Sequence, residues 1–181
     1  MKGIILTAGL GTRLWPLTKS KPKPMIEVGG KPVLEHLVDH LNHFGIYEII
    51  VNLHYLPEVI MKHFGERLLY SYEPKLLGEE GTIISLSRWI ENDFCVVMNG
   101  DTLTNLNINE MFRLSQGKNV KWMDKEVYAG TRIITPLYLL GNRDSSLYQN
   151  KNYYWFDIGT PSGLAKAREY YEKKPNRLRE L

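Results

Sequence analysis

The sequence has few of the features that would point away from an ordinary globular protein. It contains a single cysteine, Cys95, so no disulfide can form within the chain. No apolar run approaches the roughly 18 residues that a membrane span needs. Gly9, Gly11 and Arg13 interrupt the short apolar run at the start, so no signal peptide is predicted. The net charge of +3 is too small to require nucleic acid as a partner, and we expect a cytoplasmic protein that binds neither nucleic acid nor membrane.

The first half of the 181-residue chain alternates between strand-type and helix-type patterns. Apolar strands separated by amphipathic helices predict βαβ units and a mainly parallel sheet. The expected fold is therefore α/β, a Rossmann-like three-layer αβα sandwich with a mainly parallel, mixed sheet. Cys95 lies in the most apolar strand, so we predict a buried, unreactive thiol. The predicted strands are Gly3–Leu6, Tyr47–Leu53, Arg67–Tyr72 and Phe94–Met98, and the predicted helices are Pro32–Phe44, Pro57–Phe64 and Thr82–Ile90.

The second half has a less regular pattern. Its segment Leu140–Asn152 is polar and rich in turn residues, which predicts an exposed loop. No linker or change in composition divides the chain, so we expect one domain over residues 1–181, with halves of about 1–107 and 108–181. The predicted helices here are Asn109–Ser115 and Pro161–Lys173, and the predicted strands are Glu126–Thr135 and Tyr153–Phe156.

A glycine-rich loop follows the first predicted strand. Gly9 and Gly11 allow backbone N–H groups to approach a phosphate closely. Arg13 adds a permanent charge with a fork of donors, and Lys23 stands between two prolines that stiffen the backbone. The loop is not a Walker A loop, since Gly-Thr-Arg follows, nor a dinucleotide fingerprint, since Leu14 stands where a third glycine is needed. The run predicts a triphosphate-binding loop, with a solvated basic loop as the alternative.

Two aspartates follow strand-like segments. Asp101 comes just after the most apolar strand, and Asp157 follows Tyr153–Phe156 and precedes Ile-Gly. A carboxylate beyond the carboxyl end of a parallel strand faces the ligand crevice. Mg²⁺ is commonly held by one or two carboxylates together with substrate phosphates. For each aspartate taken alone, a turn or cap residue is the alternative interpretation.

Four motifs in the same order resemble the signature of the nucleoside-diphosphate-sugar pyrophosphorylases, also called sugar-1-phosphate nucleotidyltransferases. The resemblance covers most of the chain and implies a single displacement. In that reaction a sugar-1-phosphate oxygen attacks the α-phosphorus of a nucleoside triphosphate, and pyrophosphate leaves. The four motifs are Leu6–Met25, in which Ala8 replaces the first of two paired glycines, Leu77–Thr82, Asn99–Thr102 and Trp155–Pro161.

The resemblance also implies roles for individual residues. Arg13, Lys23 and Asp101 would be catalytic, and Asp101 and Asp157 would bind Mg²⁺ as the cofactor. The first half of the chain would bind the nucleotide, and the second would bind the acceptor and the metal. The implied nucleotide-binding residues are Leu6, Ala8, Gly9, Leu10, Gly11, Thr12, Arg13, Lys23, Gly78, Gly81, Asn99 and Gly100.

The base-recognition motif departs from the family pattern. It commonly reads Leu-Gly-Thr-Ala-Gly, whereas this chain has Glu79 and Glu80 between its two glycines. The two acids either stabilise the N-terminus of the following helix, whose dipole favours negative charge, or accept hydrogen bonds from a guanine edge. The segment Val51–Pro57 is most similar to the mannose- or heptose-1-phosphate guanylyltransferase branch.

The acceptor region is shorter than in the family. Between Asn107 and Tyr128, Asp124-Lys125 aligns with a family Glu-Lys pair, so the resemblance implies that Lys125 and Gly130 bind the acceptor. The acceptor is then a sugar-1-phosphate or a smaller phosphorylated alcohol. The alternative function is a catalytically inactive, pyrophosphorylase-like nucleotide-binding or regulatory domain. A homo-oligomer is compatible with the resemblance.

Three histidines share one face of the predicted helix Pro32–Phe44. His36, His40 and His43 lie opposite its apolar face, so we predict that they face solvent. No cysteine or suitably spaced acid accompanies them, and we do not expect a metal site there.

Overall fold

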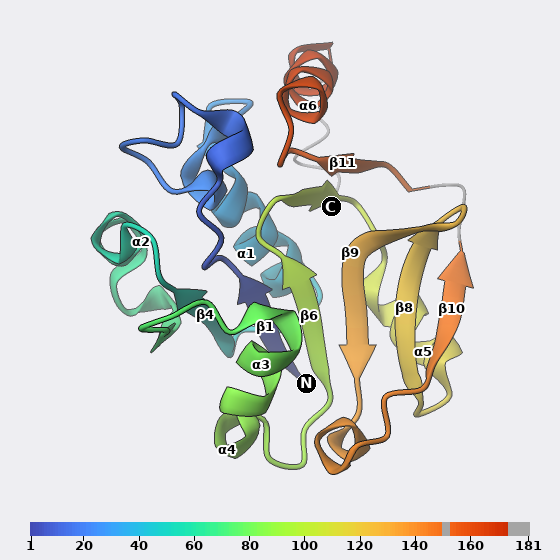
Figure 1. The fold of residues 1–181 in the computed structure, drawn as a ribbon. Coiled ribbons are helices and arrows are strands. Elements are labelled where there is room, and N and C mark those ends of the chain that lie inside the picture. Colours follow the sequence, from blue (N-terminus) through green and yellow to red (C-terminus); the bar gives the residue numbers. More distant parts are fainter. Residues whose placement is uncertain (150–152, 174–181) are drawn as a thin grey trace.

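The centre of the molecule is a seven-stranded mixed sheet (Figure 1). The computed structural model describes residues 1–149 and 153–173. All neighbouring strands pair in parallel, except where β9 runs antiparallel to β6 and β8. In spatial order the strands are β10 (Ser145–Gln149), β8 (Asn119–Asp124), β9 (Val127–Ile134), β6 (Cys95–Asn99), β1 (Lys2–Leu6), β4 (Ile49–Leu53) and β5 (Leu69–Tyr72).

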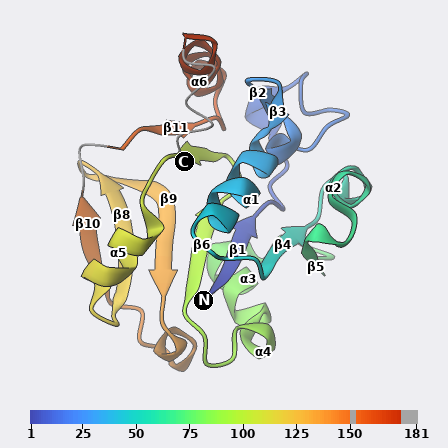
Figure 2. The ribbon, with the colours of Figure 1, turned by 180° about the vertical axis from the view of Figure 1, so that it is seen from behind.

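Helices cover both faces of this sheet (Figures 1 and 2). On one face lie α1 (Val33–His43) and α5 (Ile108–Ser115), and on the other lie α3 (Gly78–Ser85) and α4 (Ser87–Ile90). Successive strand residues point to opposite faces. Ile5 therefore joins the core beneath α1, and Ile4 joins the core beneath α3 and α4. The predicted three-layer α/β fold is confirmed.

A two-stranded ribbon stands beyond the carboxyl ends of β1 and β6 (Figure 1). It consists of β7 (Thr102–Thr104) and β11 (Trp155–Asp157), which pair antiparallel so that Asp157 lies opposite Thr102. Ile158 extends the contact by donating its N–H to the carbonyl of Asp101 at 2.9 Å. The remaining elements are η1 (Thr12–Leu14), η2 (Lys23–Met25), β2 (Glu27–Val28), β3 (Lys31–Pro32), α2 (Pro57–Phe64), η3 (Gly65–Arg67), η4 (Pro136–Leu140) and α6 (Pro161–Lys173).

Most predicted elements lie within two residues of an observed one, and the differences are local. The predicted helix Thr82–Ile90 begins earlier, at Gly78, and is interrupted at Leu86. No strand was predicted at β8. The prediction of a loop over Leu140–Asn152 is wrong for β10, which buries only Tyr148 and therefore lacks the apolar alternation of a half-buried strand. The last three residues of that predicted loop lie outside the described residues.

The prediction that the helix histidines face solvent is wrong for two of the three. His36 is 6% exposed and His40 is 2% exposed, whereas His43 is exposed. The Nε2 of His36 lies 2.8 Å from the Val28 carbonyl, and its ring packs edge-on against Tyr171 of α6. The side of α1 that carries His36 is thus covered by Val28 and by Tyr171 of α6, which the sequence of the helix itself does not reveal.

Cys95 is buried in β6, as predicted. Burial raises the pKa of its thiol to about 12, which keeps it protonated and unreactive. No helix among residues 1–149 and 153–173 combines the length and apolar character that crossing a bilayer would require.

Candidate functional site

The glycine-rich loop leaves the carboxyl end of β1 and turns into η1. Gly11 has a φ of 68°, and a Cβ there would lie 3.1 Å from side-chain atoms of both Thr18 and Lys23. Both the left-handed conformation and the close packing therefore require glycine. The Thr18 hydroxyl donates to the Gly11 carbonyl at 2.8 Å, which fixes the loop against the segment that leads to Lys23.

The backbone of Gly100 lies against the end of β1. Its N–H donates to the Leu6 carbonyl at 2.9 Å, and a Cβ at this position would lie 2.6 Å from that oxygen. Glycine is the residue that allows this approach. The contact places Asp101, the next residue, beside the glycine-rich loop.

Three predicted charged residues meet at Gly159. A Cβ added there would lie 2.8 Å from Asp101 Oδ2, 2.9 Å from Asp157 Oδ1 and 3.0 Å from Arg13 Nη2. Asp157 is held in this position because its Oδ1 accepts the N–H of Gly159 at 2.8 Å. The β7–β11 ribbon thereby joins two aspartates that are far apart in the sequence.

Lys23 adds a cation to this cluster. Its ammonium forms a short ion pair with Asp101 Oδ2, and both side chains are about one-sixth exposed. Lys23 begins η2, with Pro22 before it and Pro24 after it. The structure therefore brings together Arg13, Lys23, Asp101 and Asp157, which are the four charged residues that the sequence predicted for the site.

A cavity of about 290 Å³ opens beside the glycine-rich loop. Five of its lining residues belong to the predicted nucleotide-binding set, namely Leu6, Ala8, Gly9, Gly78 and Asn99. The others lie outside that set, although Glu79 was considered as a hydrogen-bond acceptor for guanine, and they are Asn52, Glu73, Leu76, Glu79 and Thr82.

Glu73 is the buried polar centre of this cavity, at 2% exposed. Its Oε1 accepts hydrogen bonds from Asn52 Nδ2 at 2.9 Å and from the Thr82 hydroxyl, and its Oε2 accepts the N–H of Leu77 at 3.2 Å. Asn52 in turn accepts the N–H of Thr7 at 2.6 Å. Asn52 and Glu73 lie near the carboxyl ends of β4 and β5, and that position in a parallel sheet was the available sequence signal.

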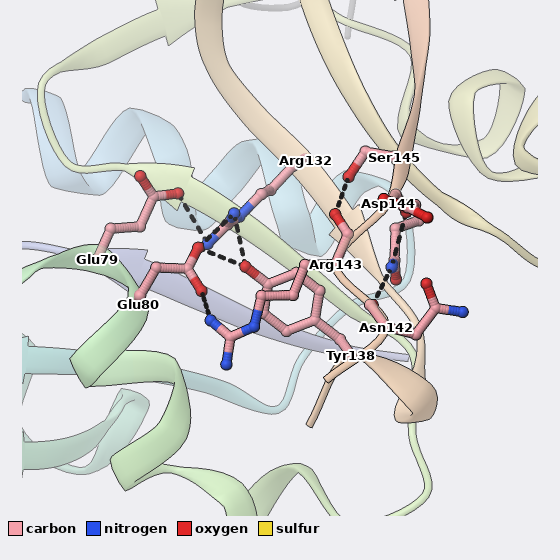
Figure 3. Close-up of polar contacts among 9 residues, drawn as sticks. Glu79, Glu80, Arg132, Tyr138, Asn142, Arg143, Asp144 and Ser145 are labelled. Atoms are coloured by element: carbon pink, nitrogen blue, oxygen red, sulfur yellow. Dashed lines mark hydrogen bonds and ion pairs between the residues drawn. The ribbon is translucent and has the colours of Figure 1, made fainter. Parts of the chain in front are cut away.

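Glu79 and Glu80 lie in the first turn of α3, where the helix dipole favours negative charge. They also pair with side chains from the second half of the chain (Figure 3). Arg132 on β9 contacts both acids, and Arg143 contacts Glu80. Neither arginine was predicted as a partner of these acids.

The two predicted acceptor-binding residues lie on or beside β9. Gly130 has a φ of 75°, and a Cβ there would lie 2.2 Å from Thr102 Oγ1 and 3.4 Å from Asn99 Cβ, so glycine is required for this approach. Lys125 occupies the exposed turn between β8 and β9, and its carbonyl accepts Gln149 Nε2 at 2.6 Å. Their role toward an acceptor stays a prediction.

The remaining predicted residues do not line the cavity. Leu10 in the loop after β1 and Thr12 at the start of η1 are exposed. Gly81 lies in α3, where a Cβ would lie 2.9 Å from Leu77 Cβ. The close packing of Gly81 keeps the first turn of α3 near the segment that leads into it.

A polar cavity and a glycine-rich loop at the carboxyl ends of a mainly parallel sheet are typical of nucleotide-binding α/β proteins. Residues 2–132 match the family model described as nucleotidyl transferase. The chain therefore belongs to the nucleotidyl transferase family. The predicted resemblance to sugar-1-phosphate nucleotidyltransferases is confirmed.

Curated relatives share between a third and two-fifths of the matched residues. D-glycero-alpha-D-manno-heptose 1-phosphate guanylyltransferase from Campylobacter jejuni is 37% identical over 123 residues, which are 65% of this chain and 55% of the relative. The UTP–glucose-1-phosphate uridylyltransferase AglF from Haloferax volcanii is 35% identical over 62% of this chain and 48% of its own. The bifunctional protein GlmU from Methanococcus maripaludis is 37% identical over 61% of this chain and 27% of its own. The chain thus spans about a quarter to about half of the length of these relatives.

Solved structures share the fold over almost the whole chain. HddC from Yersinia pseudotuberculosis has a TM-score of 0.80 at 23% identity, covering 94% of this chain and 99% of that chain. UDP-glucose pyrophosphorylase from Acinetobacter baumanii has a TM-score of 0.82 at 17% identity, covering 99% and 96%. At these identities the likeness establishes the fold.

Proposed function

We propose that this protein is a Mg²⁺-dependent nucleotidyltransferase that joins a nucleoside triphosphate to a sugar-1-phosphate, or to a similar phosphorylated acceptor, and releases pyrophosphate. The proposal rests on one observation: the side chains of Arg13, Asp101 and Asp157 meet at Gly159. Lys23 joins them through its ion pair with Asp101. These charges stand beside a cavity of suitable size for a nucleobase. Their retention favours turnover over a catalytically inactive nucleotide-binding domain.

The chain's own residues would act by positioning and by neutralising charge, which are the main requirements of phosphoryl transfer. Arg13 and the loop amides of Gly9 and Gly11 would bind the leaving pyrophosphate. Lys23 would move from Asp101 onto substrate phosphates and offset their mutual repulsion. The attacking group is a phosphate oxygen that is already ionised at neutral pH, so the displacement needs no general base.

Asp101 and Asp157 fit a Mg²⁺ ion. They offer hard oxygen ligands that converge on one point, and the ammonium of Lys23 already pairs with one of them as a cation. When bound, Mg²⁺ would supply positive charge to the phosphate oxygens. The Gly159 N–H, which holds Asp157 Oδ1, would keep that carboxylate oriented.

The cavity favours guanine. Glu73 and Glu79 are the acidic side chains that line it, and carboxylate oxygens accept hydrogen bonds. The guanine edge offers N1–H and N2–H₂ as adjacent donors, whereas uracil and thymine place one donor between two acceptors. The relatives named as guanylyltransferases, and the structure of HddC in complex with GMP-PN, agree with GTP as the preferred nucleotide.

Pyrophosphate release tests the reaction. Each of ATP, GTP, CTP, UTP and dTTP is incubated with Mg²⁺ and a panel of sugar-1-phosphates and small phosphorylated alcohols. We expect release with GTP and one acceptor, and a loss on the order of 10²- to 10³-fold in Asp101→Asn. Nucleotide binding without release from any pair would refute the transferase proposal and favour the non-catalytic domain.

A further inference from the structure

Arg132 is a charged residue buried in the sheet. Its side chain is 4% exposed and extends from β9 toward α3. Its Nη1 donates to Glu80 Oε1 and to the Tyr138 hydroxyl, each at 3.0 Å. Its Nη2 lies 3.0 Å from Glu79 Oε1 (Figure 3). One guanidinium thus forms ion pairs with both acids of the first turn of α3, and of the two it donates a hydrogen bond to Glu80.

A second arginine completes the network. Glu80 Oε1 also accepts the hydroxyl of Tyr138, and its Oε2 accepts Nη1 of Arg143 at 2.5 Å. The guanidinium groups of Arg132 and Arg143 lie 5.1 and 5.3 Å from the Tyr138 ring centre. Two carboxylates therefore meet two guanidinium groups, and the network is neutral overall.

Stability alone does not account for a buried arginine here. Removing two ions from water costs free energy that their attraction often fails to recover, and well-packed apolar side chains are commonly as stable or more so. Ile134, the next residue on the same face of β9, is such an apolar side chain in the core beneath α3 and α4. Breaking such a pair on one side is different, because it leaves a buried charge without a partner.

The network ends at the nucleotide cavity. Glu79 lines the cavity, and one of its two oxygens, Oε1, faces Arg132. Its other oxygen, Oε2, has the capacity to accept from a ligand. If Arg132 were removed, the two acids would lose their buried cation. Their negative charge would then lie beside a site that takes an anionic nucleotide.

We propose that Arg132 is a positioning residue for nucleotide selection: it holds Glu79 through Oε1, so that Oε2 is presented to donors on the nucleobase. This inference rests on the proposed function of the cavity. Arg132 acts through Glu79, so the effects of losing either side chain should overlap. The preference for a donor-rich base should fall in both cases.

Nucleotide binding without an acceptor tests this inference on the full chain. Dissociation constants for GTP and UTP with Mg²⁺ are measured by calorimetry for wild type, Arg132→Met, Glu79→Gln and the double variant. We expect each single variant to bind GTP roughly 10- to 100-fold more weakly, with a smaller effect on UTP. The double variant should be no more than about threefold weaker than the weaker single, since contacting residues are not additive.

Arg67→Met is the matched control. Arg67 pairs with Glu35 at 2.6 Å and lies 4.9 Å from the Phe64 ring centre, so it has the same chemistry outside the network. Its GTP affinity should equal that of wild type. Unchanged GTP affinity in Arg132→Met, or single effects that add in full, would overturn the inference.

Two further arms keep the test decisive. If Arg132→Met does not fold, Arg132→Lys keeps the charge and loses the fork, so GTP binding should weaken by at least about threefold. Unchanged affinity in Arg132→Lys would overturn the inference. A wild type that binds UTP as tightly as GTP refutes the guanine preference instead, and the same variants are then compared on the nucleotide that binds most tightly.

Discussion

Replacing Gly159 by alanine would place a methyl group at the point where the charged side chains of the site meet. The new Cβ would lie 2.8 Å from Asp101 Oδ2, 2.9 Å from Asp157 Oδ1 and 3.0 Å from Arg13 Nη2. Nonbonded carbon–oxygen contacts are normally well over 3 Å, so at least the two carboxylates must shift. Gly159 does not have the left-handed backbone that makes alanine strained by itself, so the perturbation is confined to the side chains around it.

The structure predicts different effects of Gly159→Ala on the free energy of unfolding and on kcat. All three crowded atoms are ends of side chains, which can rotate away, so the free energy of unfolding should fall by no more than about 1 kcal/mol. In the proposed mechanism, activity depends on those same atoms being held in place. Displacing one charged group of a preorganised site costs on the order of 10² to 10³ in kcat, or about 3 to 4 kcal/mol in the barrier.

The assay is pyrophosphate release by Gly159→Ala, with thermal unfolding measured on the same preparation. Gly3→Ala is the matched control, because its Cβ would lie 2.9 Å from Leu41 Cδ1 in the apolar core instead. That variant should lose about 1 to 3 kcal/mol of stability and keep kcat within about threefold. Full activity in Gly159→Ala would refute the reasoning that these three side chains form the catalytic centre.

Three further predictions concern other parts of the molecule. Glu73→Gln should lower kcat/KM for GTP by at least roughly tenfold, because its amide would set a donor against the Asn52 amide or the Leu77 N–H, which both donate to Glu73 in the cavity wall; an unchanged value would show that this network does not shape the cavity. Burial lowers the pKa of His40 to about 4. The unfolded chain therefore binds the proton more tightly, and the free energy of unfolding should fall by about 3 kcal/mol from pH 6.5 to pH 4. Urea unfolding of His40→Leu should show a shallower loss over this range, and an equal slope would contradict the assignment. The thiol of Cys95, with its pKa raised to about 12, should resist iodoacetamide at pH 8 until urea unfolds the protein. Rapid labelling of the folded protein would show that the thiol is accessible.

The βαβ half of the fold was predictable because local signals agree with the tertiary structure. The helix α2 begins at Pro57 and ends before Gly65, as its residues indicate. The strands β8 and β10 were not predictable in this way, because their positions depend on tertiary pairing. β8 pairs with β9, and β10 pairs with β8. A polar edge strand with one buried residue has no periodic pattern that would identify it.

The charged part of the site was predictable for a similar reason. Arg13, Lys23, Asp101 and Asp157 lie in short motifs or directly after strands, and the fold then brings those positions together. The role of Arg132 could not be predicted, because its partner Glu80 lies 52 residues away and neither spacing nor composition connects them. The burial of His36 and His40 was missed because segments distant in the sequence cover them. Tyr171 of α6 packs against the His36 ring, and the backbone of Leu106, just after β7, lies close to His40.

The β7–β11 ribbon places the two parts of the site on units of different local stability. Every residue that lines the cavity lies between positions 6 and 99, on or beside strands of the seven-stranded sheet. Asp157, by contrast, lies in a two-stranded ribbon in which three residues of each strand pair. A short two-stranded ribbon opens at a lower free energy than strands such as β1 and β6, which are paired on both sides. Hydrogen exchange should therefore show the ribbon amides opening at a lower free energy than those of β1 and β6, so that local opening releases Asp157 while the cavity persists.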